Sequence, residues 1–264
     1  MNQTATEYRG EDGLLYCKNC GTPVQCRVTF AGVERTVFCM CRCRKEQRER
    51  ELRQVKEQER MMNIQRLKAT GIQEKHLLNW RFETARDTPH LQMAKRYVNS
   101  WEKARAENLG LLLWGDVGTG KSFLAACIAN ALLEQGVPVL MTNFSKILNQ
   151  MGGMYSEERY QYISSFSRFP LLIIDDLGIE RNTEYALEQV YAVIDERYKS
   201  GLPLIVTTNL PIHEIRNPTD VAHARIYSRI LELCTPVQIA GNDRRTTIGK
   251  GKQEVVKDLL FPTS

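Results

Sequence analysis

Near the middle of the chain lies a glycine-rich segment whose residue types suit the binding of phosphate groups. Its members are Gly115, Asp116, Val117, Gly118, Thr119, Gly120, Lys121 and Ser122, followed by Phe123. They match the pattern G-x-x-x-x-G-K-[ST] between an apolar run and an amphipathic run. The glycines let backbone N–H groups surround phosphates, Lys121 places a cation on the β- and γ-oxygens, and the Ser122 hydroxyl ligates Mg²⁺. We therefore predict that these residues bind ATP with Mg²⁺, and that Lys121 also acts in catalysis.

Two carboxylates follow the apolar run 171–174, where a buried strand is expected to end. Asp175 lies where a Walker B aspartate holds Mg²⁺ through water, and Asp176 can orient and polarise the attacking water. Paired aspartates after a strand sometimes only cap a helix. Here they follow the phosphate-binding loop after one further predicted strand, and that order favours hydrolysis of ATP over binding alone.

A third polar position is Asn209, which follows the apolar run 202–208. An amide at the tip of a strand beside Asp175 can hydrogen-bond the γ-phosphate and the attacking water. A Thr-Thr-Asn sequence by itself more often marks only the exit of a strand. As the third member of an ordered set, Asn209 supports the prediction of a hydrolytic site.

Two arginine clusters lie further along the chain. Arg225 and Arg229 are four residues apart in a helical pattern, and Arg244 and Arg245 are adjacent. An arginine directed at a γ-phosphate stabilises charge in the transition state of phosphoryl transfer. Taken as isolated residues, all four would be read as surface charges.

Six of the eight cysteines lie between Cys17 and Cys43. Thiols clustered in this way in a cytosolic protein indicate metal ligands rather than disulfides. The pairs Cys17–Cys20 and Cys41–Cys43 can supply four thiolates to one tetrahedral Zn²⁺. A second pair made of Cys39 and Cys41 is the alternative, with Cys26 spare, and reduced thiols in a loop are a further reading. A segment this short and poor in apolar residues can hardly fold without a metal.

The elements that must position these residues divide the chain into three predicted regions. Residues 1–43 form a zinc-binding region with short β-like runs, and residues 44–70 form a charged helical linker. The linker carries many i,i+4 pairs of opposite charge and few apolar residues, so it is either a spacer or a lever or docking helix. Residues 71–264 form the ATPase domain.

The last region alternates between apolar strands and amphipathic helices. This alternation predicts an α/β fold, a parallel sheet with helices on both faces. The sheet should place an extra strand between the strand of the phosphate-binding loop and that of Asp175. The expected strands cover residues 109–114, 137–142, 171–175 and 202–208, and the expected helices cover 122–135, a segment from about 145, and 184–199.

Composition limits the function classes. No apolar run approaches the roughly 20 residues that cross a bilayer, and the N-terminus lacks the layout of a signal peptide, so we expect a cytoplasmic protein. The net charge of +5 permits contact with nucleic acid without requiring it.

Over roughly residues 65–250 the chain resembles the AAA+ P-loop ATPases of the DnaC/IstB type. The resemblance lies in an ordered set of motifs: the glycine loop, Leu-Ile-Ile-Asp-Asp-Leu-Gly, Thr-Thr-Asn, the Arg-x-x-x-Arg helix and the late arginine. The resemblance implies that Asn209 is the sensor 1 residue and that Arg229 is an arginine finger acting across a subunit interface. It also implies that Arg245 is the sensor 2 arginine, with Arg244 as the second choice. The stretch from Gly71 to Phe82 would lie near the adenine.

One departure from the wider AAA+ pattern concerns the second acidic residue, which is Asp176 where many members have glutamate. The shorter carboxylate reaches less far, so we expect slow hydrolysis. Turnover should also depend on self-association through the ATPase domain.

The resemblance implies a DnaC-like helicase loader, which binds a replicative DNA helicase (a DnaB-like hexamer) and delivers it to single-stranded DNA during initiation of replication. Some loaders of this type have a similar layout, with a zinc-bearing N-terminal piece, a helix and then the ATPase. We therefore expect residues 17–62 to dock the helicase. The alternative is an IstB-type transposition helper that acts on duplex DNA. A third reading is a zinc-bearing nucleic-acid adaptor whose ATP site is only a switch.

Basic and aromatic residues are candidates for a single-strand path through stacking and phosphate contact, although each is equally explained as an ordinary core or surface residue. They are Lys146, Tyr155, Arg159, Tyr160, Tyr162, Phe166 and Arg168.

Overall fold

The computed structural model describes residues 6–178, 183–241, 256 and 259–260. The chain divides into two compact units, Met1–Met62 and Asn63–Ser264. They are called the N-terminal unit and the C-terminal unit below, and each is described by itself.

Two small antiparallel sheets build the N-terminal unit. Strand β1 (Glu7–Arg9) pairs with β2 (Leu15–Cys17), and β3 (Gln25–Phe30) pairs with β4 (Val33–Phe38). The β3–β4 hairpin turns through Ala31 and Gly32, both with positive φ, as the twist of a two-residue hairpin requires. Only Cys17, Val24 and Cys41 form a buried cluster in its described residues. The unit therefore has almost no hydrophobic core.

Helix α1 (Arg42–Gly71) begins directly after Cys41, carries Cys43 in its first turn, and has residues in both units. Its residues in the N-terminal unit are mostly exposed and are laced by i,i+4 ion pairs such as Arg50–Glu46. The helix becomes buried only at Ile64 and Gly71. A Cβ on Gly71 would lie 2.1 Å from the carbonyl oxygen of Val139, so only glycine permits this close approach.

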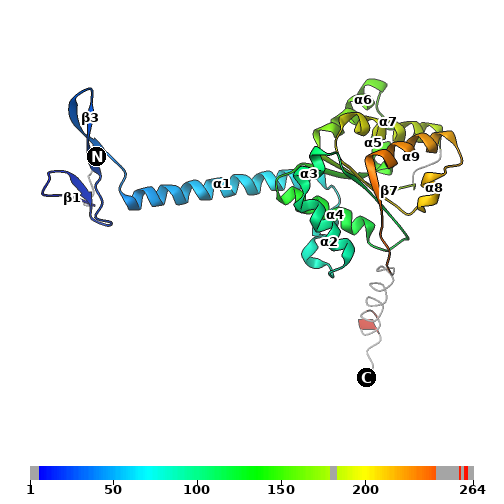
Figure 1. Ribbon diagram of the computed structural model, residues 1–264, viewed down its shortest axis with the longest axis horizontal. Helices are drawn as coiled ribbons and strands as arrows, with labels where there is room; N and C mark the ends of the chain where they lie inside the picture. The colour runs from blue at the N-terminus through cyan, green and yellow to red at the C-terminus, as the bar shows by residue number, and fades with distance from the viewer. Residues whose placement is uncertain (1–5, 179–182, 242–255, 257–258, 261–264) are drawn as a thin grey trace. The chain divides into compact units, whose positions relative to one another are not determined.

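A five-stranded parallel sheet forms the centre of the C-terminal unit (Figure 1). Its strands lie in the order β6-β7-β8-β5-β9. The predicted α/β fold is confirmed, and β8 lies between the loop-bearing strand β5 and the Asp175 strand β7. The strands are β5 (Gly110–Trp114), β6 (Val139–Asn143), β7 (Leu171–Leu177), β8 (Leu204–Thr208) and β9 (Cys234–Gln238). Strand β9, which contains Pro236, was not predicted from the sequence; its proline is tolerated because β9 is an edge strand.

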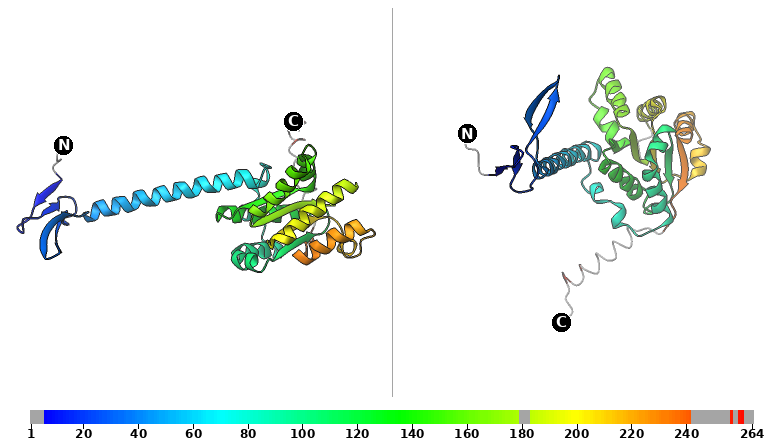
Figure 2. Two further views of the ribbon diagram at one scale, coloured as in Figure 1. Left: turned by 90° about the horizontal axis from the view of Figure 1, so that it is seen from above. Right: turned by 60° about the vertical axis from the view of Figure 1, so that its left-hand side comes forward.

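Helices cover both faces of the sheet (Figures 1 and 2). Alternation along β5 explains how, since Leu111 and Leu113 join one buried cluster and Leu112 joins the other. The first face carries α2 (Pro89–Asn99), α3 (Trp101–Ala106) and α4 (Lys121–Glu134). The second face carries α5 (Phe144–Met151), α6 (Ser156–Ser164), α7 (Glu184–Ser200), α8 (Ile212–Arg216) and α9 (Val221–Leu233). Short 3₁₀ turns are η1 (Leu77–Asn79), η2 (Phe82–Thr84) and η3 (Ser165–Arg168).

Among the helices of the described residues, none combines the length and apolar character needed to cross a membrane.

Candidate functional site

The glycine loop connects β5 to the N-terminus of α4, as the motif predicts. Gly115, Gly118 and Gly120 all have positive φ, a conformation that favours glycine. A Cβ on Gly115 would also lie 2.5 Å from the carbonyl oxygen of Ile239. The loop therefore has the open, curled backbone that can surround phosphates with N–H groups.

Lys121 is 4% exposed, and its side chain folds back across the loop. Its ammonium group donates hydrogen bonds to the carbonyl oxygens of Gly115 at 2.9 Å and Asp116 at 2.7 Å. The Thr119 hydroxyl donates to Asp116 O at 2.9 Å and ties the same turn. Because the carbonyls of these two contacts are neutral, the buried cation can exchange them for the charged oxygens of a phosphate.

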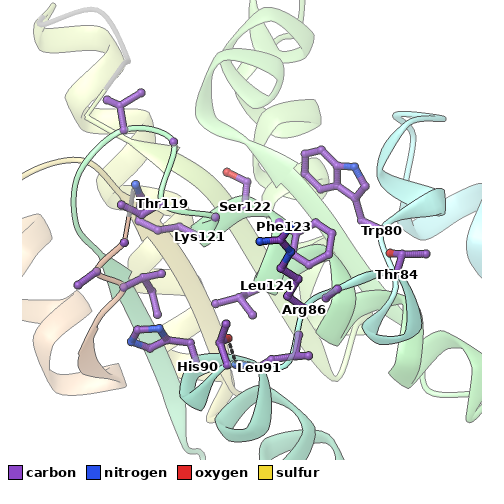
Figure 3. A pocket seen from close by; sticks show the side chains of 18 of the residues that line it. Trp80, Thr84, Arg86, His90, Leu91, Thr119, Lys121, Ser122, Phe123 and Leu124 are labelled. Carbon is purple, nitrogen blue, oxygen red and sulfur yellow. Dashed lines mark hydrogen bonds between the residues drawn. The ribbon is translucent and has the colours of Figure 1, made fainter. Parts of the chain in front are cut away.

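A pocket of about 980 Å³ opens beside this loop (Figure 3). One wall is formed by loop and helix residues 117–124, and Asp176 and Asn209 lie at the ends of β7 and β8. The opposite wall comes from the segment that precedes the sheet, and residues 239–241 complete the rim. That opposite wall consists of Trp80, Thr84, Ala85, Arg86, Asp87, Thr88, His90 and Leu91.

Asp175 lies at the carboxyl end of β7, half-buried and bound to two hydroxyl groups. Burial raises the pKa of its carboxyl above the ordinary value, and the negative charge of Asp176 adds to the rise. Hydrogen bonds from Thr207 and Ser122 oppose it. A carboxylate that burial destabilises, next to a serine hydroxyl, is a donor set that suits a hard divalent cation. The residues present therefore fit the Mg²⁺ that the loop motif implies.

Aromatic rings form the far end of the pocket. The Trp80 and Phe123 ring centroids are 5.7 Å apart at an interplanar angle of 48°. The amide of buried Asn130 in α4 donates to the carbonyl oxygens of Leu77 and Trp80, at 2.8 Å and 3.0 Å, and fixes Trp80 against that helix. Two flat apolar rings at this end are suited to contact a nucleotide base.

Several residues of the pocket were not identified from the sequence, above all Thr84, Arg86 and His90. Arg86 lines the pocket, and Figure 3 labels its side chain there. Thr84 ends η2, Arg86 lies in the irregular stretch that follows, and His90 lies in the first turn of α2, so no periodicity or motif gives a signal for them. The exposed polar sequence before a helix N-cap at Thr88 was the only local cue.

Arg229 projects from α9 toward α7, away from the pocket. Its guanidinium lies 3.9 Å from the ring centroid of Tyr198 and 3.5 Å from a carboxylate oxygen of Asp195. Within the described part of the chain, Arg229 is not among the residues that line the nucleotide pocket. Its role as an arginine finger stays a prediction. Arg244 and Arg245 lie outside the described residues.

The four thiols predicted to bind zinc lie together: the ligand atoms of Cys17, Cys20, Cys41 and Cys43 are all within 4.8 Å of one another. The Cys17–Cys43 and Cys41–Cys43 sulfur pairs are 3.6 Å and 3.3 Å apart. Four sulfurs tetrahedrally bound to Zn²⁺ at about 2.3 Å would be about 3.8 Å apart. The donor set therefore fits zinc. The Cys39 thiol instead contacts the carbonyl oxygen of Pro23 at 3.5 Å, outside this set of four.

The candidates for a single-strand path separate into two groups. Tyr162 and Phe166 pack against each other and join the apolar cluster on the second face of the sheet. Tyr155, at the N-cap of α6, and Tyr160, within that helix, are 81% and 64% exposed. Between them, Arg159 lies over the ring of Tyr185 at 5.8 Å. Lys146 forms an ion pair with Glu74.

Comparison with known proteins gives relatives of the same architecture. DnaI of Bacillus subtilis, a replicative helicase loader, is 26% identical over 147 residues, covering 52% of this chain and 47% of DnaI. DnaC of Escherichia coli K12, also a replicative helicase loader, is 30% identical over 166 residues, covering 59% of this chain and 66% of DnaC. The crystal structure of DnaI matches with a TM-score of 0.55 at 25% identity, over 68% of this chain and 100% of that one.

The chain thus spans about half of DnaI and just under two thirds of DnaC. The core is the AAA+ P-loop fold that the motif order implied. A family described as IstB-like ATP binding protein matches residues 43–250, most of the chain. This match spans the glycine loop, Asp175, Asp176 and Asn209. The chain therefore belongs to the IstB-like ATP binding proteins.

Proposed function

We propose that this protein is an ATP-dependent helicase loader, which binds a replicative DNA helicase and delivers it to single-stranded DNA. The observation that carries the proposal is the similarity to two relatives named replicative helicase loaders, DnaI and DnaC. The N-terminal unit with its four-thiol cluster adds support, because it supplies a separate module that can hold a partner.

The pocket supports hydrolysis of the bound ATP. Residues 115–123 would bind the phosphates, with Ser122 and Asp175 holding Mg²⁺. When bound there, the metal would neutralise negative charge on the phosphates. Asp176 would polarise the attacking water and Asn209 would orient it from the neighbouring strand end. Lys121 would transfer its hydrogen bonds from the loop carbonyls to the γ-phosphate.

We propose further that turnover is slow and depends on assembly. The aspartate at position 176 places its carboxylate on a short side chain, and Arg229 lies away from its own pocket. An arginine supplied by a neighbouring copy would complete the site, and Arg245 would act as sensor 2. An isolated monomer should bind ATP and hydrolyse it poorly.

The Asp176→Asn variant tests the hydrolytic role. It should keep ATP binding and lose turnover, so that the protein is trapped in its ATP state. Phosphate release in the presence of DNA and helicase is the measurement. Unchanged turnover would instead favour an adaptor whose nucleotide site is only a switch.

The exposed residues of α6 are the part of the single-strand prediction that the fold supports. Tyr155, Tyr160 and the Arg159–Tyr185 pair offer rings and a cation to solvent, as base stacking and phosphate contact require. Tyr155→Ala with Tyr160→Ala should weaken binding of a labelled single strand. Replacing Tyr162, which is half-buried against the sheet, by Phe is the control and should leave this binding unchanged.

The N-terminal unit is the proposed docking site for the helicase, with Zn²⁺ held by the four cysteines. The test is a pull-down of full-length protein and candidate helicases with and without ATP, read by native mass spectrometry. Deleting residues 1–65 should abolish the helicase complex and keep ATP binding. Retention of the helicase by the truncated chain would contradict the docking proposal.

The second candidate is a transposition helper, favoured by the match to the IstB-like family. The preferred DNA separates the two. ATP-stimulated binding to single strands supports the loader, whereas ATP-driven filaments on duplex DNA support the helper.

A further inference from the structure

The pairing of β7 with β8 is irregular where the two acidic residues lie. Ile174 pairs with Val206, and the next registered pair is Leu177 with Thr208. Two residues of β7, Asp175 and Asp176, therefore oppose the single residue Thr207. This is the geometry of a β-bulge, which re-aims side chains beside active sites.

The bulge decides where the two carboxylates point. In a regular strand, successive side chains face opposite sides of the sheet, so one of two adjacent aspartates would point away from the pocket. Here Asp176 has φ of +57°, in the left-handed region that a non-glycine residue rarely adopts. As a result Asp176 lines the nucleotide pocket, while Asp175 contacts the Ser122 hydroxyl.

Thr207 bridges this irregularity with one atom. Its hydroxyl donates to an oxygen of Asp175 at 2.5 Å and accepts the backbone N–H of Asp176 at 2.9 Å. The side chain is fully buried, so no water competes for these contacts. The hydroxyl thus replaces the ladder contact that the bulge removes and fixes the orientation of the carboxylate.

We propose that Thr207 is a positioning residue for the Mg²⁺–ATP site: its hydroxyl holds the Asp175 carboxylate in register with Ser122 and keeps the bulge that turns Asp176 into the pocket. This inference rests on the proposed ATPase function. Thr207 itself is not among the residues that line the pocket. Because it lies two residues before Asn209 on β8, it also connects the residue proposed to orient the attacking water with the metal-binding carboxylate.

The fold supplies a matched control in Thr208. This neighbour is equally buried, and its hydroxyl donates to Leu177 O at 2.8 Å and accepts from Leu210 N at 3.1 Å. Neither partner is a proposed ligand. Thr207→Val and Thr208→Val therefore remove the same group at the same depth, and only the first removes the contact with Asp175.

The test measures the affinity of full-length protein for a fluorescent, non-hydrolysable ATP analogue, with Mg²⁺ and with EDTA. Thr207→Val should raise the Mg²⁺ concentration needed for half-maximal binding about 10-fold or more, the usual effect of losing a residue that orients a metal ligand. Affinity in EDTA should not change. Thr207→Ser, which keeps the hydroxyl, should restore the Mg²⁺ response, and Thr208→Val should match the wild type.

Thermal unfolding of each variant checks that it is folded, and Thr207→Ala replaces the valine variant if the latter is not. In an Asp175→Asn background, the effect of Thr207→Val on the Mg²⁺ response should disappear. The same Mg²⁺ response in Thr207→Val and wild type, or an equal loss in Thr208→Val, would overturn the inference. Failure of the wild type to bind the analogue at all would instead overturn the proposed function.

Discussion

The two units of this chain reach an ordered structure by different means. The C-terminal unit buries apolar clusters on both faces of a parallel sheet. The N-terminal unit buries Cys17, Val24 and Cys41, and two of these three are cysteines of the proposed zinc site. Apolar burial contributes roughly 25 cal/mol for each Å², so three small side chains stabilise a fold only weakly. The N-terminal unit should therefore depend on a metal for its fold, and the C-terminal unit should not.

Removal of zinc is the change with the largest expected effect. A strong chelator should unfold the sheets of the N-terminal unit, since binding of structural zinc supplies about 10–16 kcal/mol in small zinc-dependent folds. Zinc release and the loss of β-structure by NMR are the measurements. The C-terminal unit should keep its thermal transition and its nucleotide binding.

The cysteine variants make this prediction specific. Cys43→Ser should lose the metal, whereas Cys39→Ser should retain it, because the Cys39 thiol lies outside the cluster of four. Retention of zinc by Cys43→Ser, with loss in Cys39→Ser, would restore the alternative pair of Cys39 and Cys41. Full order of the N-terminal unit after complete zinc removal would break the comparison itself.

A cavity in the core of the sheet should destabilise the C-terminal unit and leave the zinc site of the N-terminal unit unchanged. Leu112 on β5 is fully buried in the second-face cluster. Leu112→Ala should destabilise the C-terminal unit by about 2–5 kcal/mol, the usual cost of removing a buried leucine side chain. Chemical denaturation followed by tryptophan fluorescence measures this, since all three tryptophans lie in the C-terminal unit. Zinc content should not change.

A smaller effect is expected at the nucleotide site. Burial raises the pKa of Asp175, so the folded state holds this proton more tightly than the unfolded chain. A raised carboxyl pKa favours folding at low pH and penalises it as pH rises through the folded value. Without Mg²⁺, Asp175→Asn should therefore be more stable than the wild type at neutral pH, and the difference should fade on acidification.

Melting temperatures across pH 4–8 in EDTA test this sign. Asp220→Asn is the control, because the pKa of Asp220 is lowered instead of raised, mainly by the hydrogen bond from the backbone N–H of His223. It should not gain stability at neutral pH. If the wild type is instead more stable than Asp175→Asn at neutral pH, burial does not raise the pKa of Asp175 as described.

The smallest effect is expected on α1. Glu46 pairs with Arg42 and Arg50 at 3.9 Å, and all three side chains are more than half exposed. Exposed pairs of this kind contribute about 0.3–0.5 kcal/mol each. Glu46→Gln should thus change helix content by circular dichroism only slightly, and less in high salt than in low salt. A large loss of helix content would mean that these ion pairs contribute much more to the stability of α1 than exposed pairs usually do.

Much of the site could be predicted from the sequence because its signals are local. The glycine loop lies within eight residues, and Asp175 and Asn209 mark the ends of apolar runs, so strand ends in one parallel sheet had to bring them together. The cysteine spacing likewise indicated two pairs. These patterns depend on backbone conformation and periodicity over a few residues, which neighbouring side chains determine.

Other features of the site depend on contacts between residues far apart in the sequence, and only the tertiary structure decided them. The bulge that turns Asp176 into the pocket exists because β7 pairs with Thr207, some thirty residues later, and no local pattern encodes that register. The wall of Trp80 and Arg86 faces the loop only because α2 and α4 pack on one face of the sheet. Which thiols lie near Cys17 and Cys20 was likewise decided by the fold, because those of Cys41 and Cys43 lie within 4.8 Å of both, whereas the Cys39 thiol contacts Pro23 O. Contacts between distant segments set these positions, whereas the residue types alone determined the chemistry that they can perform.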